Sequence, residues 1–126
     1  MPIITLTSDW QSDSIYLAVV KGFILKNSPN SQIIDLNHGI GFQGVGEAAF
    51  VIRSSYKQFP EGTIHIIAVK SEATEKQKHL VVEIDNQYFI SNDNGIFNLI
   101  FDKPVDNIIK IDKKYGFSNL KIEKIE

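Results

Sequence analysis

Blocks of apolar and polar residues alternate along this chain and predict strands and helices in turn. Three runs rich in β-branched residues span positions 2–7, 31–37 and 63–69. These runs are apolar at successive positions, whereas strands with one wet face alternate between apolar and polar residues. The pattern therefore predicts three strands that are covered on both faces, as in a parallel sheet.

A helix is predicted between each pair of these strands. The first has Ser12 or Asp13 as its N-cap. Its apolar stripe consists of Ile15, Ala18, Val19, Gly22 and Leu25. The stripe of the second helix consists of Val45, Ala48, Ala49, Ile52 and Tyr56. Because both stripes recur at helical spacing, we expect them to face the core.

The second half of the chain predicts a hairpin. Residues 79–85 and 87–91 form its strands, joined by a tight turn at Asn86, alone or with Asp85. A short helix within 92–101 and a strand within 105–112 follow.

The order strand, helix, strand, helix, strand is the pattern of an α/β fold. We expect a three-layer α/β/α sandwich with a mostly parallel central sheet. In such sheets, ligands bind outside the carboxyl ends of the strands. We therefore expect the ligand-binding residues in the loops after the first three strands and after the hairpin.

Composition narrows the class of protein. The chain has 126 residues, which suits one domain, and a formal net charge of -2 with a pI near 5.9. Without a basic patch, no nucleic-acid partner is expected. The sequence contains no cysteine, which suits a reducing compartment. No signal peptide or membrane span is visible at the N-terminus, so we expect a cytoplasmic protein without a membrane partner.

Two candidate residues follow the first strand directly. Asp9 could accept hydrogen bonds from sugar hydroxyls, although Asp9 or Asp13 could instead cap the helix. Trp10 could stack on a base or pack at the edge of the core. Spacing alone leaves both alternatives open.

The three histidines and the Asp-Asn-Gly segment after the hairpin are weaker candidates. None of the three histidines, His38, His65 and His79, has partners at metal-ligand spacing, so no metal site is predicted and a structural role is favoured for each. Asp93 and Asn94 precede a glycine, where they could form a simple turn or present the Asn94 amide to a ligand.

The glycines at 39, 41 and 44 match the spacing of a dinucleotide-binding loop. No acidic residue ends a strand about 20 residues further on, as that fold requires. The pattern therefore does not favour a dinucleotide site.

Several motifs, taken in order, are similar to one known family. They are IITLTSDW, Tyr16, the KG pair at 21–22, NSPNSQIIDLNH, EAAF, FPEGTIHI and YFISNDNG. Together they resemble the N-terminal domain of the S-adenosylmethionine hydroxide adenosyltransferases, which are related to the fluorinase and chlorinase. The resemblance covers residue 3 to about residue 112.

The resemblance implies an activity and an assembly. Family members use water to attack the ribose of S-adenosylmethionine, releasing adenosine and methionine, and they are trimers with the site between the N-terminal domain of one subunit and the C-terminal domain of the next. We thus expect such a domain at residues 1–112, followed at residues 113–126 by a tail or linker toward an absent C-terminal domain. The expected ligand is S-adenosylmethionine or a nucleoside, without a cofactor, and the expected assembly is a homotrimer. Asp9 matches the aspartate that holds the ribose, and Asn94 lies in the matching Asp-Asn-Gly loop.

Several positions depart from the family pattern, and three of them bear on the expected site. Gln11 stands where the family usually has glycine, Ser14 where it has aspartate, and Lys70 where the third strand usually ends in the aspartate that orients the attacking water. An ammonium group would repel the sulfonium of the substrate. The sequence therefore leaves two functions open: an enzyme domain, or a catalytically lapsed domain that binds a nucleoside or forms trimers.

No catalytic residue is assigned from the sequence. The residues expected to bind substrate are Asp9, Trp10, Asp13, Lys70, Asp93 and Asn94.

Overall fold

The computed structural model describes residues 2–41, 44–69, 79–111 and 122–124. Within them, seven strands form one sheet in the order β2-β1-β3-β5-β4-β6-β7. The strands are β1 (Ile3–Ser8), β2 (Gln32–Asn37), β3 (Ile64–Ala68), β4 (His79–Ile84), β5 (Gln87–Asn92), β6 (Asn107–Ile111) and β7 (Ile122–Lys124). The helices are α1 (Ile15–Asn27), α2 (Val45–Ser55), the 3₁₀ turn η1 (Tyr56–Gln58) and α3 (Ile96–Ile100).

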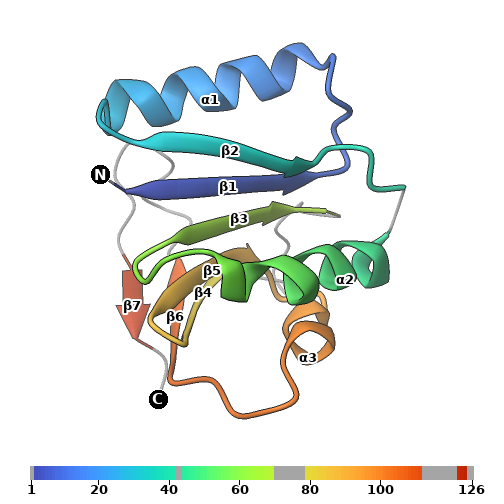
Figure 1. The fold of residues 1–126 in the computed structure, drawn as a ribbon, viewed down its shortest axis with the longest axis vertical. Helices are drawn as coiled ribbons and strands as arrows, with labels where there is room; N and C mark the ends of the chain where they lie inside the picture. Colours follow the sequence, from blue (N-terminus) through green and yellow to red (C-terminus); the bar gives the residue numbers. More distant parts are fainter. Residues whose placement is uncertain (1, 42–43, 70–78, 112–121, 125–126) are drawn as a thin grey trace.

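The sheet is mixed, with a parallel half and an antiparallel half. β1 is parallel to β2 and β3, and β3 is parallel to β5. β4 is antiparallel to β5 and β6, and β7 is antiparallel to β6. Five strands therefore point one way and two the other. Helices lie on both faces of the sheet (Figure 1), which confirms the α/β/α sandwich.

The larger core lies between the sheet and the helices α2 and α3. Ala48, Ala49 and Ile52 of α2 are fully buried there, together with Tyr56 of η1 and Phe89 of β5. The predicted stripe of the second helix is therefore confirmed. It could be read from spacing because the opposite side of α2 is mostly polar, although Phe50 is 60% exposed there.

The predicted stripe of α1 is wrong. Ile15 is 83% exposed and Val19 is 61% exposed, whereas Leu17 is buried against Ile4 and Leu6 of β1. Apolar residues lie almost all round this helix, so spacing could not tell the inner side from the outer. In Figure 1, α1 lies over β2 and β1, at one edge of the sheet.

β2 is also less buried than its sequence predicts. It is the edge strand of the sheet, and Ile34 is 36% exposed. An edge strand has a neighbour on one side only, so its side chains receive less cover than those of the central β1 and β3.

The hairpin turn between β4 and β5 is confirmed. Asp85 and Asn86 both have positive φ, 54° and 60°, as a two-residue turn matching the sheet twist requires. At the far edge, β7 pairs with β6 inside the range predicted as a tail or linker, while residues 112–121 lie outside the described part of the chain. The domain boundary at residue 112 stays a prediction.

Candidate functional site

The carboxyl ends of β1, β3 and β5 lie at one end of the sheet, where the arrowheads of β1 and β3 point the same way in Figure 1. Asp9 directly follows β1, and its backbone N–H donates to the carbonyl oxygen of Ala68 on β3 at 3.3 Å. Asn94 follows β5, and its Nδ2 donates to the carbonyl oxygen of Val69 at 3.1 Å. The loops that carry Asp9 and Asn94 are therefore both tied to the end of β3.

Lys70 is the next residue along the chain, and residues 70–78 lie outside the described part of the structure. Val69 is fully buried, and its carbonyl oxygen is the one that accepts from Asn94. The segment expected to line the site therefore follows directly on a residue that is fixed at this end of the sheet.

Trp10 packs as part of the smaller core. Its ring lies edge-on to Tyr16 of α1, with ring centroids 4.7 Å apart, and it contacts the cluster around Leu17. This arrangement supports the packing interpretation of Trp10 over a free stacking platform.

Residues 8–11 form a turn, called the site turn below, in which Gln11 adopts φ 72°. This left-handed conformation is disfavoured for any residue with a Cβ, and it is one that glycine adopts readily. The backbone N–H of Ser14 then donates to the carbonyl of Gln11 at 3.2 Å. Gln11 thus has a glycine-like backbone at the position where the resembled family usually has glycine.

The turn also corrects the predicted start of α1. Ser14 is the N-cap, because its Oγ accepts from the backbone N–H of Tyr16 at 3.1 Å. Ser12 and Asp13, the predicted caps, lie exposed in the preceding turn. The left-handed residue at position 11 extends the turn, so the helix begins later than the residue types suggested.

Asn94 is engaged mainly by the protein itself. Besides Val69, its Nδ2 donates to Asn92 Oδ1 at 3.0 Å, and its Oδ1 accepts from the backbone N–H of Ile96 at the start of α3. Asp93 is exposed beside it. Asn94 therefore fixes the loop after β5, and among the described residues one lone pair of its Oδ1 has no donor.

A row of hydrogen-bonded side chains that the sequence did not predict leads to the site turn. Ser8 Oγ lies 2.5 Å from His38 Nδ1, and His38 Nε2 lies 2.7 Å from Asp35 Oδ1. Lys21 Nζ on α1 donates to Asp35 Oδ2 at 2.6 Å. Burial by itself raises the pKa of Asp35, but hydrogen bonds from Lys21 and His38 outweigh it, so the pKa is lowered and Asp35 is a carboxylate at neutral pH.

The register of β1 and β2 explains why Ser8 meets His38. Leu6 pairs with Asp35, but the next residue, Thr7, pairs with Asn37 because of a bulge in β2. Continuing this register by one residue places His38 beside Ser8. A bulge that re-aims a side chain is a common device next to functional sites.

Two buried hydroxyl groups lie near this end of the sheet. Thr7 Oγ1 and Ser91 Oγ have no hydrogen-bond partner among the described residues, and both side chains are buried. Thr7 pairs with Ile67, and the β3–β5 register continued by one residue places Ser91 on the other side of Ile67. Buried polar groups without a partner are costly, and the two that have none among the described residues lie on the strands that lead into the site.

The glycine-rich loop after β2 has a steric explanation. A Cβ on Gly44 would lie 2.8 Å from both the Gly41 carbonyl oxygen and Ile40 Cγ2. The Gly41 N–H donates to Glu47 Oε1 on the first turn of α2 at 3.0 Å. Glycine is therefore required at position 44 by the packing of the loop itself.

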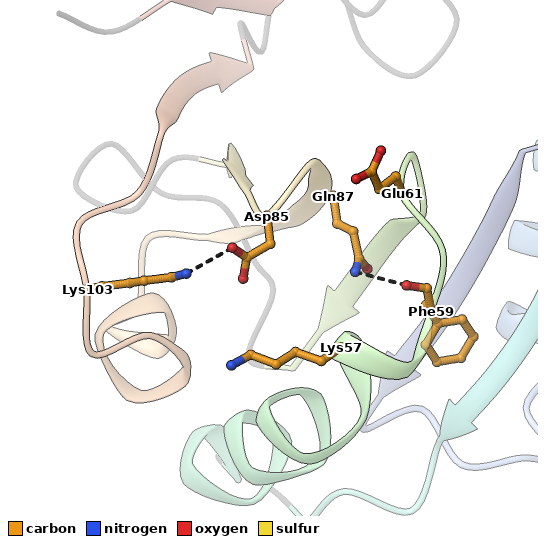
Figure 2. Close-up of a pocket in the computed structure, with 6 residues that line it drawn as sticks. All are labelled: Lys57, Phe59, Glu61, Asp85, Gln87 and Lys103. Carbon is orange, nitrogen blue, oxygen red and sulfur yellow. Dashed lines mark hydrogen bonds and ion pairs between the residues drawn. The ribbon is translucent and has the colours of Figure 1, made fainter.

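A hollow of about 370 Å³ lies at the opposite end of the sheet (Figure 2). Its lining consists of Lys57, Phe59, Glu61, Asp85, Gln87 and Lys103. Lys103 Nζ donates to Asp85 Oδ1 at 2.9 Å, and Gln87 Nε2 donates to the carbonyl of Phe59 at 3.2 Å.

The polar groups of this hollow stabilise the protein itself. Tyr56 Oη donates to Asp85 Oδ2 at 2.9 Å, and burial together with this carboxylate raises the pKa of Tyr56 to about 12. These bonds brace the hairpin turn at the amino ends of the parallel strands. Ligands of open α/β sheets bind at the carboxyl ends, so the candidate site is the end that carries Asp9 and Asn94.

Among the described residues, no three side chains of His, Cys, Asp or Glu come together as a metal site would need. Within the same residues, no helix has the length and apolar character required to cross a membrane.

Comparison with known families identifies the domain. The sequence model described as the SAM hydroxide adenosyltransferase N-terminal domain matches residues 4–124. The chain belongs to this family. The match ends at residue 124, the last residue of β7.

Two curated relatives of this adenosyltransferase domain are named (R)-S-adenosyl-L-methionine hydrolase. The protein from Methanocaldococcus jannaschii is 30% identical over 120 residues, which cover 90% of this chain and 45% of the relative. The protein from Thermus thermophilus is 27% identical over 99 residues, which cover 77% of this chain and 38% of the relative. The chain thus spans less than half the length of both relatives.

Solved structures share the fold. An uncharacterized conserved protein from Thermotoga maritima matches with a TM-score of 0.80 and 29% identity, over 86% of this chain and 42% of the other. A conserved hypothetical protein from Thermus thermophilus matches with a TM-score of 0.77 and 23% identity, over 89% of this chain and 47% of the other. The adenosyltransferase domain therefore has the same sandwich as about half of each of these proteins.

Proposed function

We propose that this domain binds the adenosyl group of S-adenosylmethionine at the carboxyl ends of β1, β3 and β5, as one half of a hydrolase site. In this role, Asp9 accepts hydrogen bonds from the ribose hydroxyls. Asp93 and Asn94 lie across the end of β3, where the rest of the ligand would extend.

One observation carries this proposal. Asp9 and Asn94 are 85 positions apart in the sequence, yet both of their loops are hydrogen-bonded to the end of β3, at Ala68 and Val69. The family resemblance alone assigned these two residues to one ligand. A fold that ties both loops to consecutive residues, the last of β3 and the one directly after it, supports a common ligand.

The reaction of the named relatives asks little acid–base chemistry of the protein. A sulfonium is already a good leaving group, so attack by water at the ribose C5′ needs a positioned and partly desolvated nucleophile more than a general acid. The products are adenosine, methionine and one proton. No cofactor is needed for this step, and none is proposed.

A second candidate function is binding without turnover. Lys70 occupies the position where the family usually has the carboxylate that orients water. An ammonium repels the sulfonium, and it becomes a base at neutral pH only if burial depresses its pKa by several units. This substitution favours a domain that binds a nucleoside but no longer hydrolyses S-adenosylmethionine.

Calorimetry and chromatography on the same samples test both candidates. The purified chain is titrated with adenosine and with S-adenosylmethionine, and the second mixture is then analysed for adenosine. Asp9→Asn keeps the shape of the side chain but removes its charge, and we expect it to weaken adenosine binding by about tenfold or more. Asp106→Asn, an exposed aspartate at the other end of the sheet, is the matched control.

The outcomes separate the candidates. Binding with release of adenosine supports the enzyme, and binding without release supports the lapsed domain. Absence of binding to the wild type, or equal loss in the Asp9 and Asp106 variants, contradicts the proposal. Asp13→Asn, measured alongside, shows whether that exposed residue belongs to the site.

The assembly and location follow as proposals. A homotrimer, implied by the family, agrees with the apolar outer side of α1, where Ile15, Tyr16 and Val19 are at least half exposed. Sedimentation velocity on the chain tests this, and a monomer at all concentrations contradicts it. A cytoplasmic location is proposed from the absence of cysteine in the sequence.

A further inference from the structure

The hydrogen bonds around His38 are consistent with one placement of its proton. A backbone N–H can only donate, so the N–H of Trp10 occupies a lone pair of Ser8 Oγ at 3.3 Å. Because Ser8 is fully buried, its hydroxyl proton needs an acceptor, and His38 Nδ1 lies 2.5 Å away. His38 Nδ1 then accepts, and the imidazole proton sits on Nε2.

The other side of the ring agrees with this placement. His38 Nε2 lies 2.7 Å from a carboxylate oxygen of Asp35, which can only accept. The second oxygen of Asp35 accepts from Lys21 at 2.6 Å. Each proton directed along the row from Lys21 to Ser8 therefore has an acceptor.

We propose that His38 is a positioning residue: held in the Nε2–H form by the Lys21–Asp35 ion pair, it fixes the shape of the site turn. The backbone supports the same link, because the N–H of Gln11 donates to the carbonyl oxygen of His38 at 2.9 Å. His38 thus holds the first residue of the turn by its side chain and the last by its backbone. The consequence for ligand binding rests on the proposed function.

The row resembles the serine, histidine and carboxylate of a hydrolase, but it is not arranged for nucleophilic attack. Ser8 is fully buried, with a relative exposure of 0%. Both ring nitrogens of His38 are engaged, one by Ser8 and one by Asp35. The arrangement therefore serves orientation.

The substitution Asp35→Asn tests the proposal because an asparagine side chain has one acceptor oxygen where aspartate has two. The ammonium of Lys21 can only donate, so the introduced amide turns its oxygen toward Lys21 and its nitrogen toward His38. His38 Nε2 must then accept, and the proton moves to Nδ1. Nδ1 no longer accepts the Ser8 proton, and the site turn loses its support.

Removing the lysine as well restores the wild-type arrangement. In the double variant Lys21→Met, Asp35→Asn, no ammonium competes for the amide oxygen at position 35. The amide can turn this oxygen to His38 Nε2–H, and Nδ1 becomes an acceptor again. A row that matters only as a surface ion pair predicts the opposite, since the double variant lacks both charges.

The direct readout is the ¹⁵N NMR spectrum of the imidazole, which distinguishes the two tautomers. We expect Nε2–H in the wild type, Nδ1–H in Asp35→Asn, and Nε2–H in both the double variant and Lys21→Met alone. Trp10 is the only tryptophan in the chain, so its fluorescence reports the site turn in the same four proteins. Urea unfolding of each shows that the fold is intact.

The spectra decide the proposal without a ligand. Nδ1–H in the wild type, an unchanged tautomer in Asp35→Asn, or a double variant no closer to the wild type than Asp35→Asn would each overturn it. So would a tautomer change that leaves the Trp10 fluorescence unchanged.

Titration with adenosine tests whether the tautomer of His38 affects ligand binding. We expect Asp35→Asn to weaken binding by about tenfold, and the double variant to recover it. If the wild type binds no adenosine while the spectra behave as described, the proposed function is contradicted and the positioning role of His38 is supported. If binding ignores the tautomer, the inference fails at its functional step.

Discussion

The left-handed backbone at Gln11 predicts how much a glycine at this position would stabilise the domain. Its φ of 72° costs a residue with a Cβ about 1–2 kcal/mol, a penalty that glycine avoids. Glycine in turn loses about 0.5–1 kcal/mol through the greater freedom of the unfolded chain. The side chain of Gln11 is exposed, and its hydrogen bonds to His38 and Ser14 are made by the backbone, so both survive the change. Gln11→Gly should therefore stabilise the domain by about 0.5–1 kcal/mol, or a rise in Tm of about 2–5 °C.

Urea unfolding of three proteins tests this reasoning. We expect Gln11→Gly to raise the midpoint without changing the slope, since the surface exposed on unfolding stays the same. Gln11→Ala is the matched control, because it removes the same side chain but keeps the Cβ and its strain. An alanine variant as stable as the glycine variant, or a glycine variant less stable than the wild type, refutes the account.

Three further predictions concern the rest of the domain. Burial lowers the pKa of His65 below 6.5, so the unfolded chain binds more protons in acid than the folded protein does. The free energy of unfolding should therefore fall as the pH drops from about 6.5 toward the folded pKa. A His65 that titrates near 6.5 in the NMR spectrum of the folded protein contradicts this. Leu17→Ala should cost about 2–5 kcal/mol in urea unfolding and Val19→Ala below about 1, and equal losses would show that the inner side of α1 is assigned wrongly. Thr7→Val removes a hydroxyl without a partner among the described residues, so it should leave the free energy of unfolding nearly unchanged. Thr5→Val breaks the 2.7 Å hydrogen bond to His65 and should lower that free energy by about 1–3 kcal/mol. Similar losses of stability for the two variants in calorimetry would contradict the comparison.

The two main helices show what periodicity can and cannot predict. Apart from the exposed Phe50, the outer side of α2 is polar or small, so spacing alone identified Ala48, Ala49 and Ile52 as core. α1 is apolar nearly all round, and spacing chose Ile15 and Val19, which lie outside. Only packing against β1 selects Leu17, and the sequence contains no local signal for that choice.

The candidate site divides in the same way. The shared location of Asp9 and Asn94 was predictable because each follows a strand, and carboxyl ends of parallel strands meet at one edge. The row from Lys21 to Ser8 was not, because Ser8 and His38 meet only through the bulge in β2. A register shift of one residue depends on the pairing of two strands 30 positions apart, and no property of either strand alone specifies it.

The energetic cost at Gln11 supports the view that the shape of the site turn matters more than its sequence. A surface turn without a role could relax from a left-handed conformation that costs about 1–2 kcal/mol. Here the conformation persists without glycine, held by the His38 carbonyl and by Ser14. Strain that the surrounding structure maintains is a feature of functional sites. Under the proposed function, Asp9 on the site turn holds the ligand while position 70 orients water, so binding and hydrolysis depend on different residues and are physically separable.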